Sequence, residues 1–226
     1  MLYYQGTYVL ILKEEFVMIN EPIIVKKEAF QAIGVSITTT NEIEASTEGK
    51  IPELWNRYFQ EQMMHHIPNQ KTKETFAFYS NYESDETGTY TFTIGTTVSS
   101  LEDVPENMTT LTIPAATYAV FTTRKGPVAE VVCEAWKYIW KWSKENKRAF
   151  TTDFELYAER ALDPNHAQLD IYIALEPKKR SPIRHLFLSL NSYWANSLLL
   201  STMRKCSIEI LETVYSETII SGGISH

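Results

Sequence analysis

The sequence is poor in the residues that build metal sites and phosphate-binding loops. It has two cysteines, Cys133 and Cys206, too few for a disulfide framework and without the spacing of a zinc site. Its eight glycines form no phosphate-binding motif, and no Gly-x-Ser-x-Gly elbow is present. His65 and His66 are adjacent and so lack the i, i+4 spacing that places two ligands on one helix face. We therefore expect no metal and no cofactor, and we interpret Cys133 as a small core residue of an apolar helix.

Basic residues are also scarce. The chain has 21 Lys and Arg against 28 Asp and Glu, a formal net charge of −7, which argues against direct binding of nucleic acid. The stretch from Glu74 to Thr123 contains seven acidic residues and no Lys or Arg. Charge alone leaves two interpretations open, a solvated acidic face or a field that attracts cations.

Long hydrophobic runs are missing as well. No basic segment followed by a long apolar run marks a signal peptide at the N-terminus. The most apolar stretch, residues 186–203, carries two Asn and four Ser, which is too polar for a spanning helix. We expect a cytoplasmic protein without a membrane segment.

Two amphipathic helices stand out in what the sequence does contain. In the first, Ile51, Leu54, Trp55, Tyr58 and Phe59 recur at helical spacing, with Pro52 in the first turn. The second repeats this spacing over residues 128–140, directly after Pro127. The tryptophans Trp55, Trp136 and Trp140 fall at core positions of these helices, although Trp140 lies toward the edge of its apolar face.

Strand patterns surround each helix in the same order. Residues 23–40 precede the first helix, and residues 76–83 and 90–98 follow it. Residues 109–123 precede the second helix, and residues 154–160 and 169–175 follow it. The sequence therefore predicts an α+β fold of duplicated β-α-β-β halves related by a pseudo-two-fold axis. The halves should form antiparallel sheet, with the two helices packed on one side and a ligand cleft between the halves.

Alternation along residues 153–159 separates two sets of side chains. Phe154, Leu156 and Ala158 share one face, and Asp153, Glu155, Tyr157 and Glu159 share the other. We expect the apolar set to lie under the helices and the acidic, aromatic set to form the binding face opposite them. In the first half, Ala77 and Tyr79 hold the places of Glu155 and Tyr157, so the two tyrosines should face each other across the cleft.

These segments resemble the GyrI-like small-molecule-binding domain, which also forms the effector-binding part of AraC-type and MerR-type multidrug regulators. The residues that carry the resemblance are the run from Ile113 to Pro127, the Trp136/Trp140 helix, Phe154-Glu-Leu-Tyr157 and Leu169-Asp-Ile-Tyr-Ile173. The first half adds Ala32-Ile-Gly34 and Ile51-Pro-Glu-Leu-Trp55, so that the resemblance spans residues 20–178.

The resemblance implies a bacterial protein that binds bulky, cationic, aromatic compounds between its halves, with Glu155 and Tyr157 at the positions of the family's acidic and aromatic ligand-binding residues. An aromatic cage and a partly desolvated carboxylate suit a delocalised cation. The expected ligand-binding residues are Glu155, Tyr157, Tyr79, Trp140, Tyr82 and Tyr118. Only 21 residues precede Pro22, so we expect a stand-alone module, monomeric or homodimeric, without a helix-turn-helix domain.

Two alternative functions remain open from the sequence. Some GyrI-like relatives hydrolyse strained, electrophilic natural products, and Glu155 with Tyr157 would then be the working pair. Other relatives modulate a DNA topoisomerase, which implies a protein-interaction module with a protein partner.

The two ends fall outside the predicted domain of residues 22–178. Residues 1–21 form an N-terminal extension, and Lys13-Glu-Glu15 can be encoded by a sequence that contains a bacterial ribosome-binding site ahead of Met18. We hypothesise that residues 1–17 are upstream sequence read in frame. Residues 179–226 match nothing in the family, and an extra helix, an interfacial segment and a translation extension all remain open.

Overall fold

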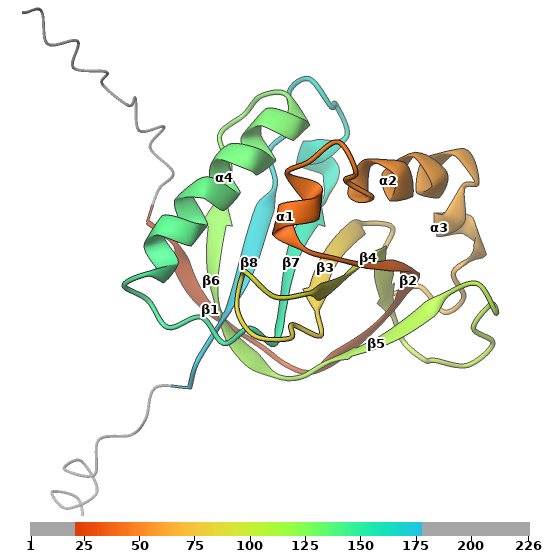
Figure 1. Cartoon of the computed structure of the whole chain (residues 1–226). Helices are drawn as coiled ribbons and strands as arrows, with labels where there is room; N and C mark the ends of the chain where they lie inside the picture. Colours follow the sequence, from red (N-terminus) through yellow and green to blue (C-terminus); the bar gives the residue numbers. More distant parts are fainter. Residues whose placement is uncertain (1–20, 178–226) are drawn as a thin grey trace, which may run out of the picture. The chain divides into compact units, whose positions relative to one another are not determined.

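Antiparallel strands form most of the regular structure. The structure, a computed structural model, describes residues 21–177 (Figure 1). The hypotheses for residues 1–17, the Leu186–Met203 stretch and the C-terminal extension concern segments outside this range. Among the described residues, no helix is both long enough and apolar enough to cross a membrane.

The strands within residues 21–177 join into one sheet. In chain order they are β1 (Ile23–Lys27), β2 (Phe30–Thr39), β3 (Thr75–Ser80), β4 (Tyr90–Val98), β5 (Thr109–Ile113), β6 (Ala116–Thr122), β7 (Thr152–Tyr157) and β8 (Asp170–Leu175). Their order across the sheet is β1-β6-β8-β7-β3-β4-β2-β5, and every neighbouring pair is antiparallel. The predicted α+β class and antiparallel sheet are confirmed.

The strand order displays the predicted duplication. Read from the centre outward, one half of the sheet is β7-β8-β6-β1 and the other is β3-β4-β2-β5. The outermost strands are exchanged between the halves, because β1 precedes β2 in sequence yet pairs with β6, while β5 precedes β6 yet pairs with β2. This exchange ties the halves together at both edges of the sheet.

The exchange also explains a difference from the sequence prediction. Each strand expected before a helix is two strands, divided at residues 28–29 in the first half and 114–115 in the second. Pro114 lies at the second division, where its missing N–H interrupts a hydrogen-bonded ladder. Strand β3 ends at Ser80 rather than at the predicted Glu83, since Asn81 adopts a left-handed conformation with φ 50°.

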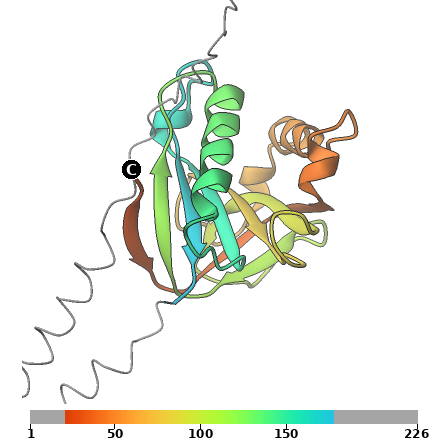
Figure 2. The same ribbon diagram turned by 60° about the vertical axis from the view of Figure 1, so that its left-hand side comes forward.

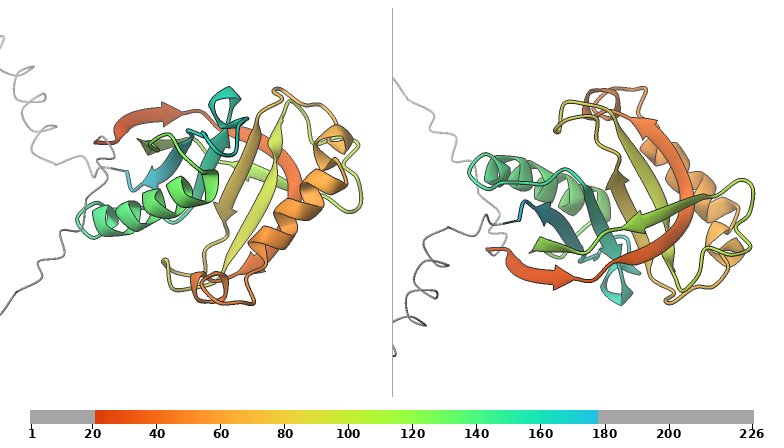
Figure 3. Two further views of the ribbon diagram at one scale, coloured as in Figure 1. Left: turned by 90° about the horizontal axis from the view of Figure 1, so that it is seen from above. Right: turned by 90° about the horizontal axis from the view of Figure 1, so that it is seen from below.

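Both long helices lie on the same side of the sheet, as predicted. Helix α2 (Ile51–Gln60) packs over β2, β3 and β4, and α4 (Val128–Ser143) packs over β6 and β8 (Figures 2 and 3). The short elements are α1 (Asn41–Glu44), α3 (Met63–His66) and the 3-10 turn η1 (Glu159–Ala161). Glu44 fixes the start of α2, because its carboxylate accepts from the N–H groups of Lys50 and Ile51, both at 3.1 Å.

The sheet is apolar on both faces. Beneath the helices, Phe121, Ile171 and Ile173 pack against α4. The opposite face carries its own buried cluster, which includes Phe76, Phe78, Tyr118 and Phe154. Because both faces of the sheet are buried, an apolar set of side chains does not by itself identify the face that the helices cover.

Candidate functional site

Glu155 occupies the centre of the sheet, where the two halves meet. Strands β3 and β7 pair so that Glu155 lies directly opposite Ala77, which holds the same place in the other half. The pseudo-two-fold axis therefore passes between these residues, with Tyr79 and Tyr157 at equivalent positions beside it. Ala77 is fully buried and has a small side chain, which leaves room for the Glu155 carboxylate.

Three uncharged donors hold this carboxylate. The hydroxyl of Tyr79 and the indole N–H of Trp136 both donate to Oε1 at 2.7 Å, and the hydroxyl of Tyr157 donates to Oε2 at 2.7 Å. The residue is 1% exposed, and this burial raises the pKa of the Glu155 carboxyl, while its three hydrogen bonds act in the opposite direction. Burial likewise raises the pKa values of Tyr79 and Tyr157, so both remain protonated donors.

The face that carries Glu155 is the opposite of the one expected. Its hydrogen bond to Trp136 of α4 shows that Glu155 lies on the helix side, whereas Phe154 belongs to the cluster on the other face. The expectation that the binding face would lie away from the helices was wrong. Tyr118 also belongs to that other cluster, where burial raises its pKa to about 12, and its side chain is separated from Glu155 by the sheet.

A second buried acid on β7 has a cationic partner. Asp153 Oδ2 accepts from Arg148 Nη2 at 2.7 Å and from the Tyr82 hydroxyl at 2.8 Å, and Oδ1 accepts from the Ala174 N–H. The side chains of Arg148 and Asp153 are 3% and 0% exposed, so this ion pair is buried. Two carboxylates two residues apart thus have different surroundings, since Asp153 is neutralised by a guanidinium and Glu155 is held by uncharged donors.

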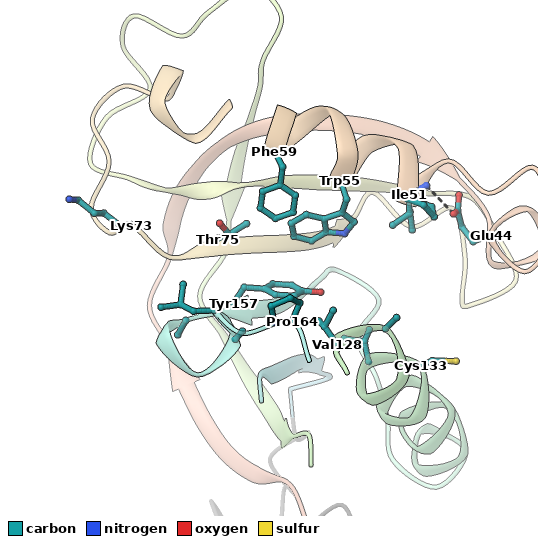
Figure 4. Close-up of a pocket in the computed structure, with 16 residues that line it drawn as sticks. Glu44, Ile51, Trp55, Phe59, Lys73, Thr75, Val128, Cys133, Tyr157 and Pro164 are labelled. Carbon is teal, nitrogen blue, oxygen red and sulfur yellow. Dashed lines mark hydrogen bonds between the residues drawn. The ribbon is translucent and has the colours of Figure 1, made fainter. Parts of the chain in front are cut away.

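A large apolar cavity, here called the larger chamber, opens between α2 and α4 and holds about 860 Å³ (Figure 4). Trp55 and Phe59 of α2 face Tyr157 and Pro164 across it, and Val128 and Cys133 of α4 lie along one side. The remaining wall comes from Glu44, Ile51, Pro52, Lys73, Thr75, Ala129, Val132, Ala158, Ala161 and Leu162. The centroids of the Trp55 and Tyr157 rings are 5.0 Å apart. Tyr157 lies between this chamber and the Glu155 carboxylate, to which its hydroxyl donates.

A smaller chamber of about 180 Å³ adjoins the first. The two share the wall residues Glu44, Ile51 and Cys133. The rest of the smaller chamber is formed by Asn41, Tyr79, Tyr82, Glu86, Tyr90, Trp136, Trp140 and Arg148. Tyr79 therefore belongs to the smaller chamber and Tyr157 to the larger one, and each donates to a different oxygen of Glu155.

The structure brings most of the predicted residues together. Tyr157 lines the larger chamber, Tyr79, Tyr82 and Trp140 line the smaller one, and Glu155 lies behind both. Tyr118 is the predicted residue that lies elsewhere.

Sequence reasoning assigned three other residues to the core that take part in the site. Trp136 is buried as expected but also donates to Glu155, and Trp55 lines the larger chamber. Cys133 was predicted to be a small core residue, and this was wrong, because it is exposed on the wall that both chambers share. Arg148 was not singled out, since a lone arginine in a loop carries no spacing signal.

Residues 23–175 match the family model Cass2, described as integron-associated effector binding protein. YobU of Bacillus subtilis (strain 168), a candidate transcriptional regulator, is 41% identical over 144 residues, which cover 63% of this chain and 90% of YobU.

Solved structures share the fold. The integron cassette protein Cass2 of Vibrio cholerae is 27% identical with a TM-score of 0.56, covering 70% of this chain and 97% of that protein. The protein SAV2435, solved bound to tetraphenylphosphonium, is 18% identical with a TM-score of 0.59, covering 70% of this chain and 94% of that one.

Proposed function

The chain belongs to the Cass2 family of integron-associated effector-binding proteins, and from this premise we propose that it captures amphipathic, cationic aromatic molecules in the larger chamber, with Glu155 as the compensating charge. The proposal is based on the central carboxylate, that of Glu155. Glu155 is buried behind an apolar, aromatic cavity, and its three hydrogen-bond partners are uncharged.

The charge of Glu155 is what makes the site selective. A desolvated carboxylate without a cationic partner is unfavourable, and a cation placed in the chamber would offset that cost. The Asp153–Arg148 pair provides an internal contrast, because its charge is already neutralised at 2.7 Å. Selection for cations therefore depends on Glu155 rather than on the acidic composition of the chain.

The aromatic walls suit the rest of such a ligand. Trp55, Phe59 and Tyr157 offer ring faces to a delocalised cation. Because the Tyr157 hydroxyl donates to the Glu155 carboxylate, the Tyr157 ring is richer in electrons and attracts a cation more strongly. The apolar lining imposes little hydrogen-bond geometry, so the chamber suits ligands of varied shape. The bound tetraphenylphosphonium of SAV2435 is a molecule of this class in a protein of the same fold. The hydrolase and interaction-module hypotheses gain no comparable support from these relatives.

Isothermal titration with a shape-matched pair of ions tests the proposal. Tetraphenylphosphonium and tetraphenylborate have nearly the same size and opposite charges. We expect the cation to bind at least tenfold more tightly, since one unit of charge differs in sign at a buried carboxylate. Equal affinities, or a preference for tetraphenylborate, would refute selection by charge.

The position of the bound ion can be checked with Cys133. In a Cys206→Ser variant, saturating tetraphenylphosphonium should slow alkylation of Cys133, because this thiol lies on the chamber wall. An unchanged alkylation rate would place the cation elsewhere on the protein.

A further inference from the structure

The larger chamber changes in character along helix α2. Phe59, Trp55 and Tyr157 gather toward one end of it, and Ile51 and Val128 lie toward the other (Figure 4). The first end is therefore aromatic and the second is aliphatic. A lining of this kind suits a ligand in which an aromatic group is followed by an aliphatic chain.

An acidic side chain lies at the aliphatic end. Glu44 comes just beyond Ile51 and lines both the larger and the smaller chamber (Figure 4). Its carboxylate accepts from the Thr39 hydroxyl at 2.6 Å and from the backbone N–H groups of Lys50 and Ile51, both at 3.1 Å. All three donors are uncharged, and no ion pair within residues 21–177 includes Glu44.

The charges around Glu44 leave this end of the chamber negative. The N-terminus of α2 contributes about half a positive charge, which offsets the carboxylate only in part. Glu86 lines the smaller chamber as well and adds to the negative charge. Arg148 of the same chamber is neutralised by Asp153, and Lys73 lies at the opposite end of the larger chamber (Figure 4). A positively charged group is therefore favoured beside Glu44.

The geometry of α2 gives the distance between the two ends. Trp55 follows Ile51 by four residues, which is about 6 Å along the helix axis. The Glu44 carboxylate lies 3.1 Å beyond the N–H of Ile51. A cation against Trp55 is then about 6 to 9 Å from a group beside Glu44. An extended chain of about five methylene groups, at roughly 1.2 Å per bond, spans this distance.

We propose that Glu44 is a second ligand-binding residue and that the ligand carries two positive charges. One is the aromatic cation at the Glu155 end of the chamber. The other is a compact ammonium group beside Glu44, joined to the first by a short aliphatic chain along Ile51 and Val128. The inference rests on the proposed function in one respect, the position of the first cation.

Two probes of matched shape test the second charge on the full-length protein by titration calorimetry. Both consist of triphenylphosphonium with a five-methylene chain, which ends in trimethylammonium in one and in tert-butyl in the other. Without an acid at the end of the chain, the tert-butyl compound should bind more tightly, because its end group is easier to remove from water. We expect the doubly charged compound to bind at least about fivefold more tightly, since charges about 4 Å apart attract by this factor even at the dielectric constant of water. Equal affinities, or a preference for tert-butyl, would overturn the proposal.

A pair of variants assigns the effect to Glu44. Glu44→Gln removes its charge, so the preference for the doubly charged compound should be lost. Glu42→Gln is the matched control, because Glu42 is an exposed acid of the same short helix, α1, and lines neither chamber. A preference that survives Glu44→Gln, or that falls equally in Glu42→Gln, would contradict the assignment.

A measurement on the wild type covers the case in which Glu44→Gln does not fold. In protein labelled with ¹³C in the isoleucine methyl groups, the trimethylammonium protons should give a nuclear Overhauser contact to the methyl group of Ile51, which lies beside Glu44. Absence of this contact at saturation would overturn the placement of the second charge.

The two proposals fail separately in these experiments. Glu155→Gln should weaken both probes equally and leave the preference between them unchanged. If it leaves both affinities unchanged while Glu44→Gln abolishes the preference, the role of Glu155 fails and that of Glu44 stands. If Glu155→Gln weakens both probes but the wild type shows no preference, the role of Glu44 fails and that of Glu155 stands.

Discussion

Replacing Glu155 with glutamine removes one charge at the centre of the sheet while it keeps the size of the side chain and its ability to hydrogen bond. A cation stacked on Tyr157 would lie about 4 to 5 Å from the ring centre. The Tyr157 hydroxyl lies 2.7 Å from the carboxylate, so the two charges are about 7 Å apart. At an effective dielectric constant of about 20, charges at this separation attract by about 2.4 kcal/mol. Glu155→Gln should therefore weaken binding of tetraphenylphosphonium by about fiftyfold.

The same change should have little effect on stability. Burial already disfavours the charged form of Glu155, and glutamine retains an acceptor for Tyr79 and Trp136. We expect the free energy of unfolding to change by less than about 1 kcal/mol. Glutamine makes weaker hydrogen bonds than a carboxylate, but the protein no longer has to bury a charge, and the two effects offset each other.

Titration calorimetry on three proteins separates the effect of the Glu155 charge from a nonspecific loss of binding. Wild type, Glu155→Gln and Glu159→Gln are compared, the last being a matched loss of charge at an exposed glutamate just beyond the same strand. Binding of neutral triphenylphosphine oxide should stay within about twofold in all three. Equal loss of affinity for the cation and the neutral compound in Glu155→Gln would refute the role of its charge.

Four other predictions concern the same region. Binding of tetraphenylphosphonium should weaken by up to about tenfold per pH unit as the pH falls below the raised pKa of Glu155, because the cation binds the ionised form; a flat affinity profile between pH 4 and 8 would contradict this. The effect of pH on folding has the opposite sign, because the folded state favours the neutral form of the Glu155 carboxyl. The free energy of unfolding, measured by chemical denaturation, should therefore decrease as the pH rises from 4.5 to the raised pKa of Glu155. Trp136→Phe keeps an aromatic side chain but removes the indole N–H that donates to the carboxylate, so the midpoint of the affinity profile should move to higher pH. A midpoint that stays or falls would count against that hydrogen bond. Arg148→Met leaves Asp153 buried without its partner and should cost about 3–5 kcal/mol in urea unfolding, whereas Arg160→Met, in a partly exposed pair, should cost less than about 1 kcal/mol; similar costs would contradict the contrast.

The duplication and the identity of the central residues were predictable from the sequence. Helical spacing located α2 and α4, and strand alternation grouped Asp153, Glu155 and Tyr157 on one face. The correspondence of Ala77 and Tyr79 with Glu155 and Tyr157 placed the two tyrosines on either side of the axis before the pairing of β3 and β7 was known.

The direction of that face was not predictable, for a physical reason. Alternation shows which side chains lie together, but not which side of the sheet the helices cover. The rule that apolar residues lie under helices failed because Phe154 and Leu156 have a buried cluster of their own on the far side. Glu155 satisfies its polar atoms under the helices through Tyr79, Tyr157 and Trp136, contacts that depend on distant parts of the chain.

The sequence pattern also did not reveal the side chains that both pack in the core and bond to a buried acid. Trp136 follows the helical pattern of a core residue and is one, and nothing in that pattern reveals that its N–H reaches a carboxylate on β7. Arg148 pairs with Asp153 only five positions away, yet the loop between them has no periodicity that would indicate the direction of either side chain. Such pairings become visible only with the tertiary structure.

A crystal structure of the protein with tetraphenylphosphonium would show where the cation binds. We expect the phosphonium in the larger chamber, with one phenyl ring against Trp55 or Tyr157 and with Glu155 as the nearest buried carboxylate. A cation bound outside this chamber, or seated there with another acid nearer to its charge, would contradict this expectation.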